Sequence, residues 1–335
     1  MRWDRGRRSD NIEDRRGDGG GMSFPSGRMG GRIGIPGGRA GAGGFGLIAI
    51  VVVALLLGVD PSQLLQGNFG DSSSSYVPQA PTSAQEEQLK DFVSVVLGDT
   101  EDTWHEQFRS LGSTYEEPKL VLFSGALDSG CGSAQSAMGP FYCPQDHKVY
   151  LDLSFFQELS DRFGAPGDFA GAYVIAHEVG HHVQNLLGVM GKVDSARGGS
   201  SDTGADSLSV RLELQADCLA GVWARNADRA RHILEQGDIE EAMQAAAAVG
   251  DDRLQRAAGR RVNPESWTHG SAAQRKQWFL TGNQSGDIDS CLLVGPIAPA
   301  TKRGLFGVFL VHASAASRAR RTASTFSSLT RCVSP

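Results

Sequence analysis

The five residues His177-Glu178-Val179-Gly180-His181 lie in a segment that begins at Asp168, contains no proline and repeats its apolar residues at helical spacing. Residues four apart share one face of a helix, so His177 and His181 can direct their imidazole nitrogens at one metal ion. Glu178 follows the first histidine and can polarise a metal-bound water without becoming a ligand. The pattern predicts a zinc-binding helix in the core. The alternative is a core helix whose histidines make only hydrogen bonds.

A second segment, residues 211–217, can complete such a site. Catalytic zinc usually takes three protein ligands and leaves one position for water. Glu213 and Asp217 are four apart in a stretch that also has a helical pattern, so they share one face. We expect Glu213 to be the third ligand and Asp217 to accept the free ring N–H of a ligand histidine. In the alternative, both carboxylates are solvated surface charges, which the apolar residues around them disfavour.

The pairing of Glu-x-x-Ala-Asp with an upstream His-Glu-x-x-His is that of the gluzincin peptidases. The chain resembles one group of these, the putative neutral zinc metallopeptidase family of bacterial membrane-anchored proteins. Besides the two helices, the stretches that carry the resemblance are Met1–Trp3, Ser9–Asn11, Gly139–Pro144, Val149–Leu153 and Thr268–Ser271. The resemblance runs from residue 1 to about 290, apart from a variable linker, and implies Zn²⁺ as cofactor and a protein or peptide as substrate.

A further segment, Thr268-His269 with Arg275 after it, resembles a Thr-His-Pro segment with a later arginine in another membrane-associated gluzincin group; here Gly270 replaces the proline. The resemblance implies that His269 stabilises the oxyanion formed when water attacks an amide. Tyr173 is the second candidate for this role. Alternatively, His269 caps a helix that begins near Ser271 or lies on a loop.

The histidine next to the second ligand, His182, points about 100° away from it around the helix. We therefore expect His182 to be structural.

Composition and charge limit the classes of protein to which the chain can belong. The 335 residues, 40% of them hydrophobic, suffice for one catalytic domain with appendages. Residues 1–40 carry nine arginines against five acidic residues, and residues 297–335 carry six basic residues and no acidic one. Since the net charge is −6, residues 41–296 hold a formal −16. Such an acidic domain disfavours nucleic acid as a partner.

Residues 40–59 form an uncharged run between Arg39 and Asp60. Twenty helical residues rise about 30 Å, the thickness of the hydrocarbon core of a bilayer. Three arginines precede the run within twelve residues, and aspartates follow it. Because positive residues stay inside, we expect a single-pass inner-membrane protein with a cytoplasmic amino terminus and a periplasmic or extracellular catalytic domain. A cleaved signal peptide is the alternative.

These features divide the chain into five parts. Residues 1–39 and 60–84 are rich in charged, glycine, serine or proline residues, which favours disorder and flexibility. Residues 292–335 lack a periodic pattern of apolar residues and differ from the ending that is usual in the family. Nothing is therefore inferred for them from the family. The predicted parts are a disordered cytoplasmic tail (1–39), a transmembrane helix (40–59), a flexible linker (60–84), a zinc metallopeptidase domain (85–295) and an atypical disordered tail (296–335).

Within the domain, the periodicities predict a helix-dominated α+β fold with a small sheet. Strands are expected at 119–123 and 148–152, and helices, besides the two of the metal site, at 86–97, 103–111, 154–163 and 239–249. An edge strand of the sheet could pair with an extended substrate.

Five cysteines are present. Cys131 and Cys143 flank loop-like sequence and are expected to form a disulfide, because an outward-facing domain lies in an oxidising space. Cys218 can pair with Cys291, which leaves Cys332 unpaired. A second metal site at Cys131, Cys143 and His147 is the alternative.

The sequence therefore predicts a membrane-anchored zinc endopeptidase in which Glu178 is the general base. Two alternatives remain, namely a non-catalytic binding or scaffold protein stabilised by zinc, and a metal-dependent amidase with a non-protein substrate.

Overall fold

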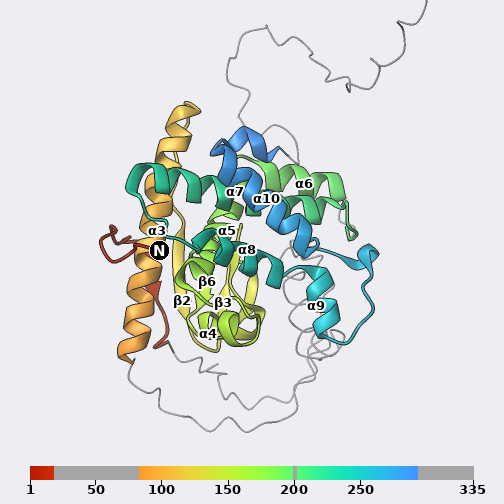
Figure 1. Cartoon of the computed structure of the whole chain (residues 1–335), viewed down its shortest axis with the longest axis horizontal. Coiled ribbons are helices and arrows are strands. Elements are labelled where there is room, and N and C mark those ends of the chain that lie inside the picture. The colour runs from red at the N-terminus through yellow and green to blue at the C-terminus, as the bar shows by residue number, and fades with distance from the viewer. Residues whose placement is uncertain (19–82, 199–201, 293–335) are drawn as a thin grey trace, which may run out of the picture. The chain divides into compact units, whose positions relative to one another are not determined.

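Helices dominate the fold, with a small sheet against them, as the sequence predicts. The computed structural model describes residues 1–18, 83–198 and 202–292 (Figure 1). The strands are β1 (Ile12–Asp14), β2 (Lys119–Phe123), β3 (Ala126–Ser129), β4 (Gly132–Gln135), β5 (Phe141–Cys143) and β6 (Lys148–Asp152). The α-helices are α3 (Ala84–Ser110), α4 (Ser154–Asp161), α5 (Asp168–Leu186), α6 (Val189–Arg197), α7 (Leu208–Arg231), α8 (Asp238–Ala248), α9 (Asp251–Ala257) and α10 (Ala272–Ser285).

The main sheet has the order β1-β2-β6-β5. Strands β1, β2 and β6 are parallel, and β5 runs antiparallel to β6 as an edge strand. The bounds of β2 and β6 are those predicted, because their apolar residues are buried on both faces and read as continuous apolar runs. Strands β3 and β4 form a separate two-stranded sheet.

Helix α3 is continuous over 27 residues, whereas the sequence predicts two helices, 86–97 and 103–111. A Ser83–Glu86 capping box begins it. The predicted break contains Gly98 and Asp99, which are weak helix formers. Packing overrides this preference. A Cβ at Gly98 would lie 2.7 Å from the backbone oxygen of Arg7, and Asp99 accepts hydrogen bonds from Trp223 and Arg231 of α7.

Helix α5 runs through the middle of the fold, in contact with α3, α7, α8 and the sheet (Figure 1). All residues from Phe169 to Gln184 are buried. The helix approaches α7 closely at Gly180, where a Cβ would lie only 3.0 Å from the backbone oxygen of Ala216. A glycine at this crossing lets the two helices approach closely, and Glu213 and Asp217 lie on either side of Ala216 in α7.

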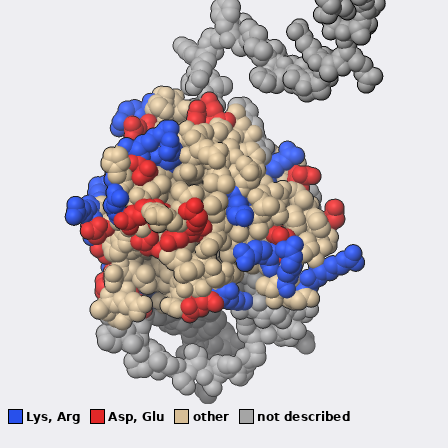
Figure 2. Space-filling model, in the orientation of Figure 1, with Lys and Arg blue, Asp and Glu red and all other residues tan. Residues whose placement is uncertain are grey.

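Residues 1–18 are part of the fold, which corrects the prediction that this part of the tail is disordered. They contain β1, and the side chains of Met1 and Arg16 are almost fully buried. Their charged residues make them look disordered in isolation, yet the domain supplies partners for those charges. Both charge types appear on the face shown in Figure 2, where acidic side chains gather on the side of the amino terminus.

The predicted transmembrane run 40–59, most of the linker and the tail from residue 296 lie outside the described residues. Among the helices that the structure does describe, none combines the length and the apolar character needed to cross a membrane.

Both predicted cysteine pairs are disulfides in the structure. Cys131 joins Cys143, and Cys218 of α7 joins Cys291 in a short 3₁₀ helix, Ile288–Cys291. Disulfide sulfurs are not thiolates, so the alternative metal site at Cys131, Cys143 and His147 is wrong.

Candidate metal centre

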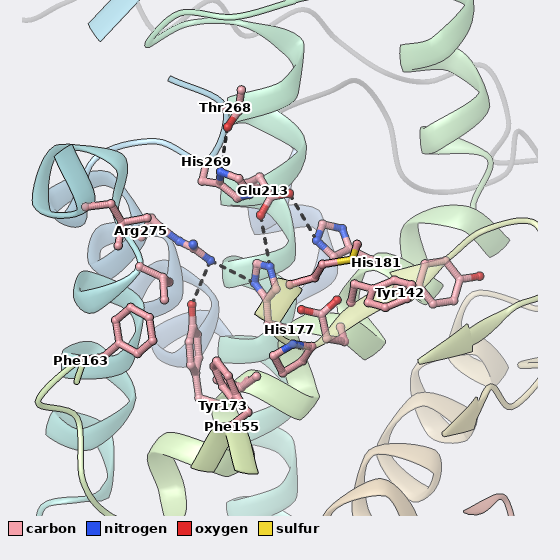
Figure 3. Close-up of a pocket in the computed structure, with 18 of the residues that line it drawn as sticks. Tyr142, Phe155, Phe163, Tyr173, His177, His181, Glu213, Thr268, His269 and Arg275 are labelled. Atoms are coloured by element: carbon pink, nitrogen blue, oxygen red, sulfur yellow. Dashed lines mark hydrogen bonds and ion pairs between the residues drawn. The ribbon is translucent and has the colours of Figure 1, made fainter. Parts of the chain in front are cut away.

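Three donor atoms converge in the cleft between α5 and α7 (Figure 3). The Nε2 atom of His177 lies 3.3 Å from one carboxylate oxygen of Glu213, and the Nε2 atom of His181 lies 3.6 Å from the other. Zinc–nitrogen and zinc–oxygen bonds of about 2.1 Å in a tetrahedron separate neighbouring donors by about 3.4 Å. The two nitrogens and the carboxylate therefore fit a single zinc ion, and the three residues are those that the sequence predicts.

Hydrogen bonds fix the tautomers of both histidines. The Nδ1 atom of His177 lies 2.9 Å from Oδ1 of Asp217, and Nδ1 of His181 lies 2.9 Å from the amide oxygen of Gln184. Both oxygens can only accept, so in the neutral ring that binds a metal each Nδ1 carries the proton and each Nε2 has the lone pair. The lone pairs face Glu213, which is the arrangement that metal ligation needs. The role of Asp217 is predicted from the sequence and that of Gln184 is not, although Gln184 follows His181 by about one helical turn.

Electrostatics also favours a cation. Burial alone would lower the pKa of His177, but the carboxylates of Asp217 and Glu213 outweigh it and raise the pKa to about 9. Burial likewise opposes ionisation of Glu213, yet the imidazoles of His269 and His181 hold its pKa well below the usual range. The site thus keeps two buried carboxylates ionised and stabilises positive charge between them.

Arg275 of α10 holds Asp217 in place. Its guanidinium donates two hydrogen bonds of 2.9 Å to the two oxygens of the Asp217 carboxylate, and both side chains are buried. Burial would raise the pKa of Asp217, but Arg275 and His177 together outweigh it and lower the pKa below the ordinary value. In the sequence, Arg275 stands out only through a resemblance to another gluzincin group. Its role depends on the packing of α10 against α7.

Tyr173 belongs to the same network, which corrects its prediction as a candidate oxyanion donor. Its hydroxyl donates to Oδ1 of Asp217, and the residue is 1% exposed. Its only proton is therefore engaged by a carboxylate and unavailable to a substrate. Tyr173 helps Arg275 to orient Asp217.

His269 lies beside Glu213 in the loop before α10 (Figure 3). Asp251 holds this loop, because one of its oxygens accepts the backbone N–H groups of Thr268, His269 and Gly270. His269 does not cap α10, since Ser271 does so with a Gln274 capping box. Burial would lower the pKa of His269, but Glu213 and Asp251 raise it above the ordinary value. Its ring lines the cleft at the edge of the metal centre.

Glu178 is not among the three converging donors. It lies in the wall of the same cleft and is 8% exposed. Burial raises its pKa above the ordinary carboxyl value. A buried carboxylate with a raised pKa beside a metal site is suited to accept and return a proton.

The cleft continues along an apolar wall. Its lining includes part of the edge strand β5 and rings from α4 and the turn that follows, namely Phe141, Tyr142, Phe155 and Phe163. Figure 3 shows Phe155 and Phe163 on the Tyr173 side of the histidines and Tyr142 on the His181 side. The edge strand β5, which is not among the strands predicted from the sequence, thus borders the metal centre.

His182 is structural, as expected. It is fully buried, its Nε2 atom donates to the backbone oxygen of Glu116 at 2.6 Å, and its Nδ1 atom lies 3.0 Å from the hydroxyl of Tyr142. Since Nε2 carries the proton, Nδ1 accepts from Tyr142, whose hydroxyl oxygen in turn accepts from Asn185 at 3.0 Å. This chain of bonds attaches the edge strand β5 to the metal-site helix.

The sequence pattern of the family described as "Putative neutral zinc metallopeptidase" matches residues 1–293. The chain belongs to this family. Membership implies Zn²⁺ as the cofactor, in agreement with the donor set in the cleft.

Relatives cover most of the chain. The uncharacterized protein YpfJ of Escherichia coli strain K12 is 48% identical over 297 residues, which make up 88% of this chain and 99% of that protein. The uncharacterized protein Rv2575 of Mycobacterium tuberculosis strain H37Rv is 45% identical over 253 residues, or 71% of this chain and 84% of that protein. No solved structure matches the chain significantly.

Proposed function

We propose that the protein is a zinc-dependent endopeptidase that hydrolyses peptide bonds with Glu178 as its general base. The observation that carries the proposal is the presence of Glu178 in the wall of a cleft that also holds the three donors His177, His181 and Glu213. A site that used zinc for stability alone would have no need of this additional acidic group. Peptide substrates are consistent with the family.

Zn²⁺, when bound, lowers the pKa of a water molecule and polarises the scissile carbonyl. Glu178 takes the proton of the attacking water and returns it to the leaving amine. No covalent intermediate is required, so no nucleophilic serine or cysteine is assigned. All four cysteines that the structure describes are in disulfides, which also argues against the Cys ligand common in deformylases.

Other residues of the site bind the substrate or orient a ligand histidine. His269 donates to the oxyanion that forms on the substrate, because its ring is held at the cleft and its pKa is raised. Asp217 and Arg275 fix the orientation of the His177 ring. The edge strand β5 pairs with the main chain of an extended substrate, and the adjoining apolar wall accommodates an apolar side chain.

The predicted membrane anchor, residues 40–59, rests on sequence evidence alone. It is left out of the proposal, because a single crossing there would separate residues 1–18 from the strand with which they pair.

The test compares the wild-type full chain with a Glu178→Gln variant on an unfolded protein substrate, with and without chelator. The full chain is used because residues 1–18 belong to the fold. We expect wild-type cleavage that chelator abolishes, and a variant that binds zinc normally but is at least about 100-fold slower. A matched variant, Glu240→Gln on the exposed face of α8, should behave as wild type.

Wild-type protein that retains zinc and cleaves no protein would contradict the proposal and favour the scaffold alternative. Hydrolysis of small amides without cleavage of peptides would favour the amidase.

A further inference from the structure

Residues 1–18 share one sheet with the catalytic domain. Strand β1 pairs in parallel with β2, with Ile12 opposite Leu120. At one end of the pair the backbone N–H of Leu120 donates to Asn11 at 2.8 Å, and at the other the N–H of Arg15 donates to Leu122 at 2.8 Å. The segment therefore covers an edge of β2 that would otherwise present unpaired backbone groups.

Glu101 of α3 shows how far the domain depends on this segment. Its carboxyl side chain is 1% exposed. The hydrogen bonds that it accepts come from Arg7, at 2.7 Å, Asn11, at 2.9 Å, and the hydroxyl of Ser9. All three partners lie in residues 1–18. Residues 1–18 thus supply these hydrogen bonds to a buried carboxylate, which is unfavourable when it is left unpaired.

Arg16 is a buried charge of the segment that the domain pairs in turn. Its side chain is 4% exposed, and its guanidinium donates to Asp14 at 2.6 Å and to Glu87 of α3 at 2.8 Å. Arg5, by contrast, is 94% exposed and lies 3.9 Å from Asp4, which is itself exposed. The arginines of the segment thus divide into those that the domain buries and those that remain in solvent.

The segment also reaches the start of the metal-site helix. The amino group of Met1 lies 2.6 Å from Asp168, the first residue of α5, and 3.4 Å from Asp238, the first residue of α8. The ring of Trp3 packs edge-on against Phe92 of α3 at 5.5 Å. Residues 1–18 therefore contact α3, α5 and β2 at once.

We infer that residues 1–18 and residues 83–292 fold together on the same side of any membrane that the chain meets. If the run 40–59 crossed a bilayer once, the two parts would be on opposite sides, and neither the β1–β2 pairing nor the Glu101 contacts could form. The orientation predicted from the arginines, with the amino terminus in the cytoplasm and the catalytic domain outside, is incompatible with this pairing. The two disulfides indicate that the shared side is an oxidising one. The inference is independent of catalysis.

The first test measures which side each part occupies in the full chain. Single cysteines are introduced at Arg5 and, separately, at the exposed Arg109 of α3, in a Cys332→Ser background. Spheroplasts of producing cells are treated with a membrane-impermeant maleimide, and detergent-solubilised samples give the total labelling. We expect both positions to be labelled equally. Labelling of one position with protection of the other would overturn the inference. Equal protection of both positions would show that the two parts share the cytoplasmic side, which would overturn the conclusion that the shared side is an oxidising one.

The second test measures whether the segment is built into the fold. In the purified full chain, Arg16→Gln should lower the melting temperature by about 5 °C or more, because it leaves carboxylates without their buried partner. Arg5→Gln removes the same charge from a solvent-exposed position and should leave the melting temperature unchanged. Equal melting temperatures of the two variants would overturn the inference.

Discussion

The Asp217 carboxylate accepts from Nδ1 of His177 at 2.9 Å while it accepts two hydrogen bonds from Arg275. The metal-site helix, α7 and α10 thus meet at one buried carboxylate. The orientation of a ligand histidine consequently depends on a helix that contributes no ligand. The geometry of the metal centre is a property of the packed domain as well as of its motif.

Replacement of Asp217 by asparagine should weaken zinc binding by about 10- to 100-fold, because an amide holds the His177 ring less firmly and lowers its basicity. It also leaves the Arg275 charge buried without its carboxylate, so the melting temperature should fall. Zinc affinity is measured by competition with a chelator. Asp289→Asn, at an exposed position, is the matched control. Zinc affinity equal to that of the wild type would show that Asp217 does not orient the ligand.

The metal ligands could be predicted from sequence because their spacing is local. His177 and His181 are one helical turn apart, so a single helix presents both whatever surrounds it. Glu213 is predictable from its own helix and from the resemblance. Its distance from the histidines is not, since that depends on the close approach of Gly180 to Ala216.

The amino-terminal strand could not be predicted, because its pairing is non-local. Arg7 and Arg16 look like solvated charges in a disordered tail until α3 supplies Glu101 and Glu87. For the same reason the sequence predicts a break in α3 near Gly98, where the backbone of Arg7 actually packs against the helix. In both cases the deciding contacts join residues between 71 and 94 positions apart.

His269→Ala should lower kcat by about 100-fold or more and leave the zinc content unchanged, because a donor to the transition state is lost while the metal ligands remain. Steady-state kinetics and metal analysis on the same preparations test this. His105→Ala, on α3 and 41% exposed, is the control and should have wild-type kinetics. An unchanged kcat for His269→Ala would remove the residue from the mechanism.

Tyr142→Phe should raise KM more than it lowers kcat, since the hydroxyl of Tyr142 attaches the edge strand to the metal-site helix through His182 and Asn185. The variant leaves the buried Nδ1 of His182 without its donor, at a cost of about 1–3 kcal/mol in stability. Tyr115→Phe is a matched control, because the buried hydroxyl of Tyr115 has no hydrogen-bond partner among the described residues. If both variants had wild-type KM and melting temperature, the position of β5 would not depend on the hydrogen bond between Tyr142 and His182.

The contact of the amino-terminal segment with the domain should also depend on pH through Asp14. Hydrogen bonds from Arg16 and Lys90 lower the pKa of Asp14 well below the ordinary value of 3.8, although partial burial opposes the shift. A carboxyl group whose pKa is lower in the folded state stabilises that state fully above its unfolded pKa, and this stabilisation is lost as the pH falls through the folded value. The wild type should therefore melt above Asp14→Asn at pH 7, and the difference should begin to shrink below about pH 4. Asp10→Asn, at an exposed position, should show no difference at either pH. A difference that stayed constant or grew on acidification would show that the ionised carboxylate of Asp14 does not hold the segment to the domain.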